Sequence, residues 1–288
     1  MTPESIIRVF PRHTKASPDD ERAFFGPPPI RTRQIKELFD RTSEVHIDVT
    51  FTQDKLRAEW LAEQWQSVAS VKIGGVAFGD PGYGPFTPGK YIKPGYTFTS
   101  RGCPRRCWFC SVWKRRPQAI PIWPFEPGWN VLDDNLLACP EWHVRAVFQM
   151  LALQGRQIEF TGGLEAAALE DYHVGLLADM KPRPNCFFAY DPGDPFETLK
   201  SAADRLIGAG FTARSHRLRA YVLIGYPKDT FDAVEKRMKQ MLAIGFTPHA
   251  MLWEPETPSA ERWRPAPEWK RFQRLWARPA ITHARNAS

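Results

Sequence analysis

The sequence predicts an α/β fold in which parallel strands alternate with helices. From Tyr96 onward, short runs of apolar, β-branched or aromatic residues alternate with longer segments of helical period. Glycines and prolines stand at the changes between these segments, as expected for turns and helix ends. The chain has 288 residues, 43% hydrophobic and 25% charged, so it is long enough to bury a full α/β core.

The N-terminal region predicts one βαβ unit. Residues 44–51 alternate like a strand, residues 53–68 have a helical period, and residues 71–78 predict a second strand with a glycine turn. The residues expected on the inner face of the helix are Leu56, Trp60, Leu61, Trp65 and Val68. Such a unit is about half of a small doubly wound, Rossmann-like domain.

Six further strands are predicted, over residues 96–100, 130–134, 157–161, 186–190, 219–224 and 250–253. A helix follows the second strand over residues 140–154, where Pro140 suits the first turn and Gly155 the C-terminal stop. A second helix is predicted after the third strand, and it ends at Lys181-Pro182. Later helices carry apolar faces formed by Leu199, Ala202, Leu206 and Ile207, and by Val234, Met238, Met241 and Leu242.

Three cysteines stand close together directly after the first of these six strands. Cys103, Cys107 and Cys110 form a C-x-x-x-C-x-x-C triplet, with Phe109 just before the last cysteine. Three thiolates can wrap one corner of a metal cluster, but they leave one coordination position open. An iron with a vacant site can chelate a small molecule, which is typical of a catalytic cluster.

This motif resembles the signature of the radical S-adenosylmethionine (SAM) enzymes. The resemblance implies that the three cysteines hold a 4Fe-4S cluster whose fourth iron binds the methionine end of SAM. It also implies a partial (β/α)6 barrel over the six strands. Reductive cleavage of SAM would give a 5′-deoxyadenosyl radical that abstracts hydrogen from a substrate, which the sequence does not identify. The electrons would come from an external flavodoxin- or ferredoxin-like donor, because no second cysteine cluster is present.

In such barrels, chemistry gathers at the carboxyl ends of the strands. Asp133, Asp134 and Asn135 end the second strand, where members of the family place groups that accept hydrogen bonds from the SAM ammonium. The alternative is that these residues cap the following helix.

Later strand ends supply the remaining site candidates. Gly162, Gly163 and Glu165 resemble the Gly-Gly-Glu element of the family, with an extra leucine and one strand later than usual. Here the glycines predict a close-approach turn, while contact of the carboxylate with SAM or substrate stays open.

The fourth and fifth strands add three more candidates. Tyr190 and Asp191 end the fourth strand and would reach the ribose or carboxylate of SAM, although Asp191-Pro-Gly is also an ordinary turn. Gly225 lies in a segment whose backbone, by resemblance, packs against adenine.

The predicted organisation has three parts: residues 1–94, 95–255 and 256–288. The first resembles a shortened form of the cobalamin-binding domain found in one radical SAM subgroup. Its cobalamin-ligating Asp-x-His-x-x-Gly run has no match here, so we expect no bound corrinoid. A cobalamin-assisted radical methyltransferase is the alternative enzyme.

The net charge of +7 is unevenly distributed. Residues 101–116 contain six Lys or Arg and no acid, and residues 261–288 contain seven against two Glu. These segments would stabilise a cluster, attract an anion or contact nucleic acid. The alternative for the tail, which includes Trp263, Trp269, Phe272 and Trp276, is a packed helix with a solvated basic face.

The cysteine count and the N-terminus bear on compartment. Five cysteines is an odd number, and neither a signal segment nor a membrane-spanning run is present, so a reducing cytoplasm is expected. A zinc site with Cys139, His143 or Cys186 as fourth ligand is the alternative metal centre, and a nonenzymatic, metal-stapled nucleic-acid-binding module is the alternative function.

Overall fold

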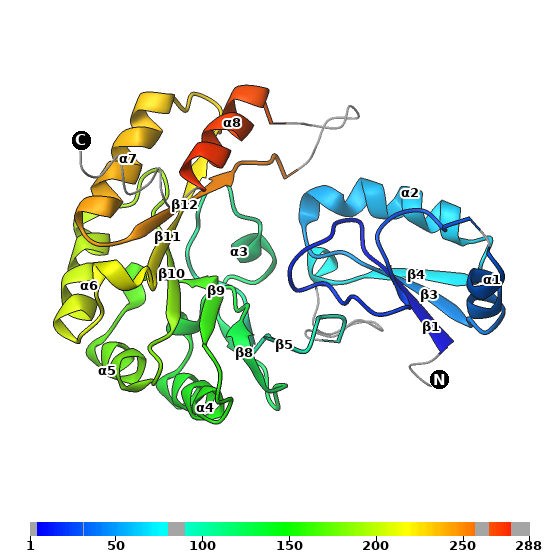
Figure 1. The fold of residues 1–288 in the computed structure, drawn as a ribbon, viewed down its shortest axis with the longest axis horizontal. Coiled ribbons are helices and arrows are strands. Elements are labelled where there is room, and N and C mark those ends of the chain that lie inside the picture. The colour runs from blue at the N-terminus through cyan, green and yellow to red at the C-terminus, as the bar shows by residue number, and fades with distance from the viewer. Residues whose placement is uncertain (1–4, 31, 80–89, 257–264, 278–288) are drawn as a thin grey trace. The chain divides into compact units, whose positions relative to one another are not determined.

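The computed structural model describes residues 5–30, 32–79, 90–256 and 265–277. The chain divides into two compact units, Met1–Tyr96 and Thr97–Ser288 (Figure 1). The first boundary lies close to the one expected after residue 94. The segment 256–288, expected as a separate tail, falls within the second unit. No helix in the described ranges is long and apolar enough to cross a membrane.

The first unit is a parallel four-stranded sheet with the order β2-β1-β3-β4. Its strands are β1 (Ile6–Val9), β2 (Ala23–Phe24), β3 (Glu44–Asp48) and β4 (Ser70–Gly74), and its helices are α1 (Arg33–Asp40) and α2 (Lys55–Trp65). The predicted βαβ unit corresponds to β3, α2 and β4. Strand β1 was not predicted because four residues are too few to establish a period.

The buried face of α2 is narrower than the sequence predicts. Leu61 and Trp65 are fully buried, together with Ala58, one turn before Leu61. Leu56 is 54% exposed and Trp60 is 45% exposed, so the prediction that they face inward is wrong. The small side chain of Ala58 lets the helix approach the sheet closely, and the bulkier residues on either side of this stripe remain outside it.

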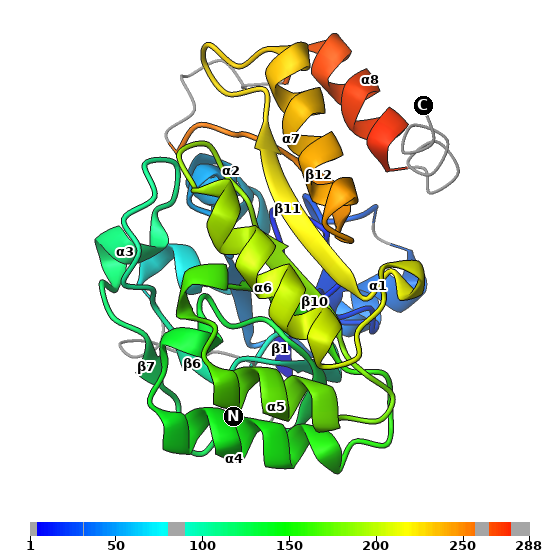
Figure 2. The same ribbon diagram turned by 90° about the vertical axis from the view of Figure 1, so that its left-hand side faces the viewer.

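The second unit contains a six-stranded sheet with the order β12-β11-β10-β9-β8-β5, in which β8 to β12 are parallel. Its strands are β5 (Gly95–Thr97), β8 (Gly128–Val131), β9 (Glu159–Leu164), β10 (Asn185–Ala189), β11 (Leu218–Ile224) and β12 (Thr247–Leu252). Figures 1 and 2 show its helices along the sheet: α4 (Glu141–Ala152), α5 (Asp171–Asp179), α6 (Phe196–Gly208) and α7 (Phe231–Ala243). Alternating strands and helices are therefore confirmed.

Smaller elements complete the two units. A two-stranded antiparallel ribbon pairs β6 (Ser100–Arg101) with β7 (Ile120–Pro121), and the short helix α3 (Val112–Arg115) lies between them in sequence. Short 3-10 turns lie at Thr52–Asp54, Val76–Phe78, Leu136–Ala138, Ala166–Ala168 and Ala213–Ser215.

Two strand boundaries differ from the predictions in ways that affect the site. The strand expected over residues 96–100 is divided between β5 and β6 because the chain leaves the large sheet to form the ribbon. Strand β9 continues through Gly162 and Gly163, which were expected in a turn after it. The pairing of β9 with β10 shifts register here, from Cys186↔Phe160 to Phe188↔Leu164, so the glycines form a bulge within the strand.

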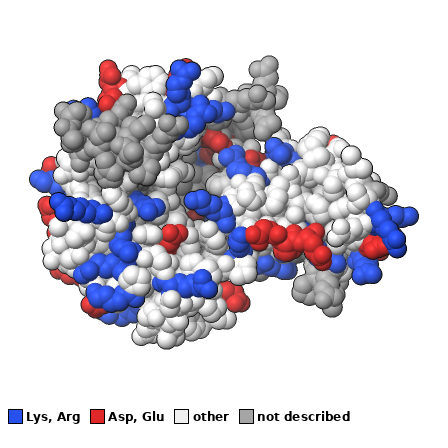
Figure 3. Space-filling model, in the orientation of Figure 1, with Lys and Arg blue, Asp and Glu red and all other residues white. Residues whose placement is uncertain are grey.

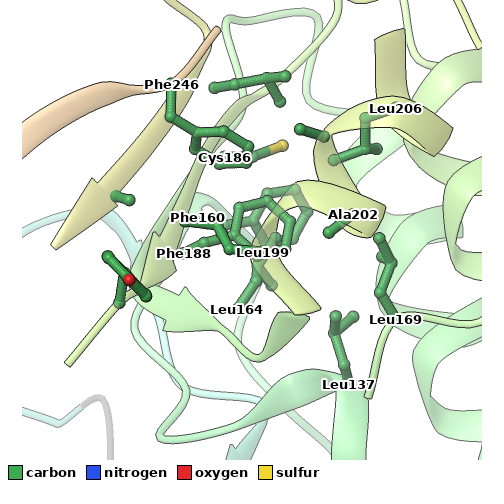
Figure 4. Close-up of a cluster of buried hydrophobic side chains, with 14 of the residues drawn as sticks. Leu137, Phe160, Leu164, Leu169, Cys186, Phe188, Leu199, Ala202, Leu206 and Phe246 are labelled. Carbon is green, nitrogen blue, oxygen red and sulfur yellow. The ribbon is translucent and has the colours of Figure 1, made fainter. Parts of the chain in front are cut away.

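The core of the second unit lies between its sheet and its helices. Figure 4 shows Phe160, Cys186 and Phe188 from the strands packed with Leu199, Ala202 and Leu206 of α6. The sulfur of Cys186 is fully buried in this apolar cluster. Ile207, expected on the inward face of α6, is 40% exposed because it lies beside the buried stripe.

The described part of the basic tail is helix α8 (Pro267–Trp276), which packs along β12. Phe272 is 9% exposed and Trp276 is 2% exposed, so these rings belong to the core. The side-chain amide of Gln273 donates to the carbonyl oxygen of Ala250 at 2.9 Å, which covers a polar group of the edge strand. The packed-helix alternative thus applies to this segment, whereas Trp263 lies outside the described residues.

Candidate functional site

The three cysteines lie on one loop that begins immediately after β6. All five cysteines of the chain are free, and these three are partly buried. The backbone amide of Cys103 donates to the carbonyl oxygen of Arg116 at 3.1 Å, which closes the base of the loop. Gly102 has φ +95°, and a Cβ there would lie 2.0 Å from the carbonyl oxygen of Gln118. Only glycine therefore fits this closure.

Burial is the main influence on the three thiols. It raises the pKa of Cys107 to about 11 and also raises the pKa of Cys103 and of Cys110. Nearby acidic groups act in the same direction for each thiol. Among the described residues, no group of three or more His, Cys, Asp or Glu side chains is arranged to hold a single metal ion. Among these described side chains, the three thiols share one loop but are not themselves grouped as the ligands of a metal ion.

Asp133 accepts three hydrogen bonds from the chain segment that precedes the cysteine loop. Its carboxyl oxygens accept hydrogen bonds from the backbone amide and hydroxyl of Thr99, at 2.6 and 2.5 Å, and from the hydroxyl of Ser100 at 2.7 Å. The residue is 1% exposed, and burial raises the pKa of its carboxyl group. Both oxygens are engaged by these donors, so Asp133 stabilises the turn between β5 and β6.

Asp134 supports the first residue of the loop. Its carboxylate accepts a hydrogen bond from the backbone amide of Gly102 at 2.8 Å, and its other oxygen lies 3.8 Å from the guanidinium of Arg101. Arg101 is 3% exposed and also stacks over the ring of Phe98. These contacts fix where the chain enters the loop. None of residues 133–135 caps helix α4, whose N-cap is Pro140, and Asn135 precedes the 3-10 turn at Leu136 without a side-chain capping bond.

Asn135 is the residue of this segment that contacts a cysteine. Its side-chain nitrogen donates to the Sγ of Cys103 at 3.4 Å and to a carboxylate oxygen of Glu165 at 2.6 Å. Its side-chain oxygen is buried and has no hydrogen-bond partner among the described residues. A buried acceptor without a donor is costly for a protein. Asn135 therefore presents an unused acceptor beside Cys103.

Glu165 is brought to the same place by the glycine bulge of β9. A Cβ at Gly162 would lie 2.3 Å from the carbonyl oxygen of Asp133, so the two backbones touch at this point. Gly163 has φ +107°, which directs the chain toward Glu165. The sequence predicted that the glycines allow a close backbone approach, and the structure shows that Gly162 packs against the segment that follows β8.

Arg105 joins the cysteine loop to two further acidic residues. Its Nη2 donates to Asp194 at 2.6 Å, and its Nε lies 3.3 Å from Glu165. Asp194 also accepts the backbone amide of Asp191, whose own carboxylate accepts the backbone amide of Leu223 at 3.1 Å. Burial, and then the negative charge of Asp194, raises the pKa of Asp191 to about 7.

Three of the predicted site residues lie elsewhere or face other groups. Tyr190 is 6% exposed, and its hydroxyl donates to Gln240 of α7 at 3.3 Å, so it belongs to the helix side of the sheet. Phe109 makes an edge contact with Trp108. Gly225 has φ +72°, and the ring of Trp269 from α8 lies 3.0 Å from the position of a Cβ.

The basic run 101–116 is partly neutralised by acids from other loops. Besides the pairs of Arg101 and Arg105, Lys114 forms an ion pair with Glu256. Figure 3 shows basic side chains spread over the visible face of the second unit instead of gathered in one patch. Arg105 and Asp194 were not predicted as site residues. The sequence indicated Arg105 only as one of the six basic residues of the run 101–116, and it gave no signal for Asp194.

The sheet and this loop together define an α/β protein that holds three thiols beside the carboxyl ends of parallel strands. No family model, curated protein or solved structure matches the chain.

Proposed function

We propose that the second unit is a radical SAM enzyme in which Cys103, Cys107 and Cys110 hold a 4Fe-4S cluster. The observation that carries this proposal is the set of three free, partly buried thiols on one loop, beside an Asn135 oxygen that has no partner in the described part of the chain. Thiolates are the ligands that such clusters require. A cluster bound there would supply the electron that cleaves SAM.

The consecutive strand order from β8 to β12, with helices between the strands, supports a partial (β/α)6 barrel. In that arrangement, the loops after β8, β9, β10 and β11 meet at one mouth. Asn135 Oδ1 would accept a hydrogen bond from the SAM ammonium, and Glu165 would contribute negative charge next to it. An external reductant, flavodoxin- or ferredoxin-like, would complete the reaction.

The zinc alternative has less support from the described residues. Cys186 is fully buried in the helix-side core, and His143 Nε2 lies 3.3 Å from the hydroxyl of Thr99. Cys139 is 6% exposed and lies near Ser100. Within the described ranges, none of the three makes a contact with the cysteine loop that would favour it as a fourth ligand.

Anaerobic reconstitution tests the proposal. Purified protein is incubated with iron, sulfide and a thiol reductant, desalted, and analysed for iron and sulfide and by Mössbauer spectroscopy. A reductant and SAM are then added, and 5′-deoxyadenosine is measured. We expect four irons per chain and SAM-dependent formation of 5′-deoxyadenosine. A colourless protein that binds zinc and not SAM would contradict the proposal and favour a metal-stapled module, whereas retained corrinoid would favour the methyltransferase.

A further inference from the structure

We infer that Arg105 is a positioning residue that holds the cysteine loop against the carboxyl ends of β9 and β10. The inference rests on the proposed function, in which the thiols on either side of Arg105 share one cluster. Arg105 stands between Cys103 and Cys107 in the sequence, so its side chain anchors the centre of the loop while its neighbours remain available as ligands.

The contacts of Arg105 are directional and partly shielded from water. One nitrogen of its guanidinium bonds Asp194 at 2.6 Å, and a second lies 3.3 Å from Glu165. The Arg105 side chain is 35% exposed, and the two acidic side chains are 13% and 16% exposed. Charge-assisted contacts at such partly buried positions are stronger than those on an open surface.

Each acid is itself held by a second contact. Glu165 also accepts a hydrogen bond from Asn135, which donates to Cys103. Asp194 also accepts the backbone amide of Asp191, which bonds the end of β11 through Leu223. Arg105 therefore connects the loop to a network that includes the ends of four strands.

The geometry favours arginine over lysine. A guanidinium presents several N–H groups in a fixed plane and can reach two carboxylates at once, whereas an ammonium on a flexible chain acts as a point charge. The adjacent Arg106 provides a matched control. It is exposed and forms no ion pair with any described residue.

Hydrogen-deuterium exchange of the metal-free, full-length protein tests the role of Arg105 without a cluster. In Arg105→Gln, we expect the amides of residues 102–110 to exchange about tenfold faster, the effect of losing one charge-assisted contact. Amides of α6 should be unchanged. Arg106→Gln should match the wild type, and Arg105→Lys should fall between the two. If Arg105→Gln does not fold, Asp194→Asn removes the same ion pair from the other side, and it should accelerate exchange of the same loop amides.

Iron retention is the second measurement. In the reconstituted protein, iron release to a chelator should be several times faster in Arg105→Gln than in the wild type or Arg106→Gln. Unchanged loop exchange in both Arg105→Gln and Asp194→Asn, or equal acceleration in α6, would overturn the inference. If the wild type binds no iron, the proposed function fails, while the exchange experiment still decides whether Arg105 positions the loop.

Discussion

At the scale of single residues, the side chains that follow β8 are adjacent in sequence and differ in role. Asp133 is buried and its oxygens accept from Thr99 and Ser100, Asp134 supports Gly102, and Asn135 keeps an oxygen without a partner among the described residues. The difference arises from burial and from which donors surround each side chain. Substitutions at the three positions should therefore have different consequences.

The first prediction concerns the cysteines. Cys103→Ala, Cys107→Ala and Cys110→Ala should each abolish four-iron binding and SAM cleavage, because under the proposed function each removes one of only three thiolate ligands. Cys139→Ala and Cys186→Ala are the controls, and they should keep the iron even if they lose stability, since both residues are packed in the core. Iron analysis and Mössbauer spectra of the five variants measure this. An intact, SAM-cleaving cluster in any of the first three would be incompatible with the assignment.

The second prediction separates Asp133 from Asn135. Asp133→Asn should lower the free energy of unfolding by about 1 to 3 kcal/mol, because at least one buried donor loses its acceptor. Asn135→Ala should instead weaken SAM binding about tenfold at unchanged iron content, the loss of one hydrogen bond to a charged group. Denaturant unfolding and SAM titration measure the two effects. A normal SAM affinity in Asn135→Ala would remove Asn135 from the binding site.

At the scale of elements, helix ends carry interactions that respond to pH. Helix α5 begins with a capping box in which the side chain of His173 accepts the backbone amide of Glu170 at 2.9 Å. His173 is fully buried, and burial, followed by the nearby charge of Arg205, lowers its pKa from 6.5 to about 4. The imidazole must be neutral to accept this bond.

The third prediction concerns this histidine. Between pH 6.5 and about 4, the unfolded chain binds a proton at His173 that the folded protein does not, so stability falls as the pH is lowered through this range. The loss should reach about 3 kcal/mol. Gln is a usual residue at this position of a capping box, so His173→Gln keeps a hydrogen-bond acceptor but has no group that titrates. The free energy of unfolding of this variant should therefore decline less over the same pH range. Identical pH profiles of unfolding for the two proteins would contradict the prediction.

The fourth prediction concerns helix α8. Trp276→Ala should destabilise the second unit by about 3 to 5 kcal/mol, because it deletes a large ring that is 2% exposed. Arg274→Ala, two residues earlier on the same helix and exposed, is the control. Thermal melting and binding to RNA and DNA at low salt are measured together. A lost nucleic-acid affinity at unchanged melting temperature would restore the role of this helix as a binding arm.

At the scale of the whole molecule, each unit has its own apolar core. The core of the first unit includes Ile7, Ile47 and Trp65, and the core of the second includes Phe160, Phe188 and Met238. A separate core is the physical basis of independent folding. We therefore expect the two units to unfold in separate steps.

The fifth prediction uses this separation. Ile47→Ala and Phe188→Ala should each lower the free energy of unfolding by about 2 to 5 kcal/mol. They should affect different calorimetric transitions, because one substitution leaves a cavity in the core of the first unit and the other in the core of the second. The wild type should show two transitions, one lowered by each variant. A single transition that both variants lower equally would show that the units unfold together.

The order of strands and helices in the second unit was predictable from local sequence patterns. Apolar periodicity is a local property, so the runs at residues 186–190 and 219–224 were recognisable without knowledge of the fold. The cysteine loop was likewise visible from spacing alone. Local pattern could not show that Leu56 and Trp60 of α2 stay exposed, because both fit a helical period and only packing against the sheet selects the buried face.

Which polar groups contact one another follows from the folded arrangement of the chain and not from local sequence. Arg105 and Asp194 are 89 residues apart, and Thr99 and Asp133 are 34 apart. These contacts depend on strand order, register and the glycine bulge of β9, which bring distant loops to one edge of the sheet. Sequence spacing carries no record of that geometry. The cysteines were therefore predictable as a motif, whereas the residues that hold their loop in place became evident only from the folded chain.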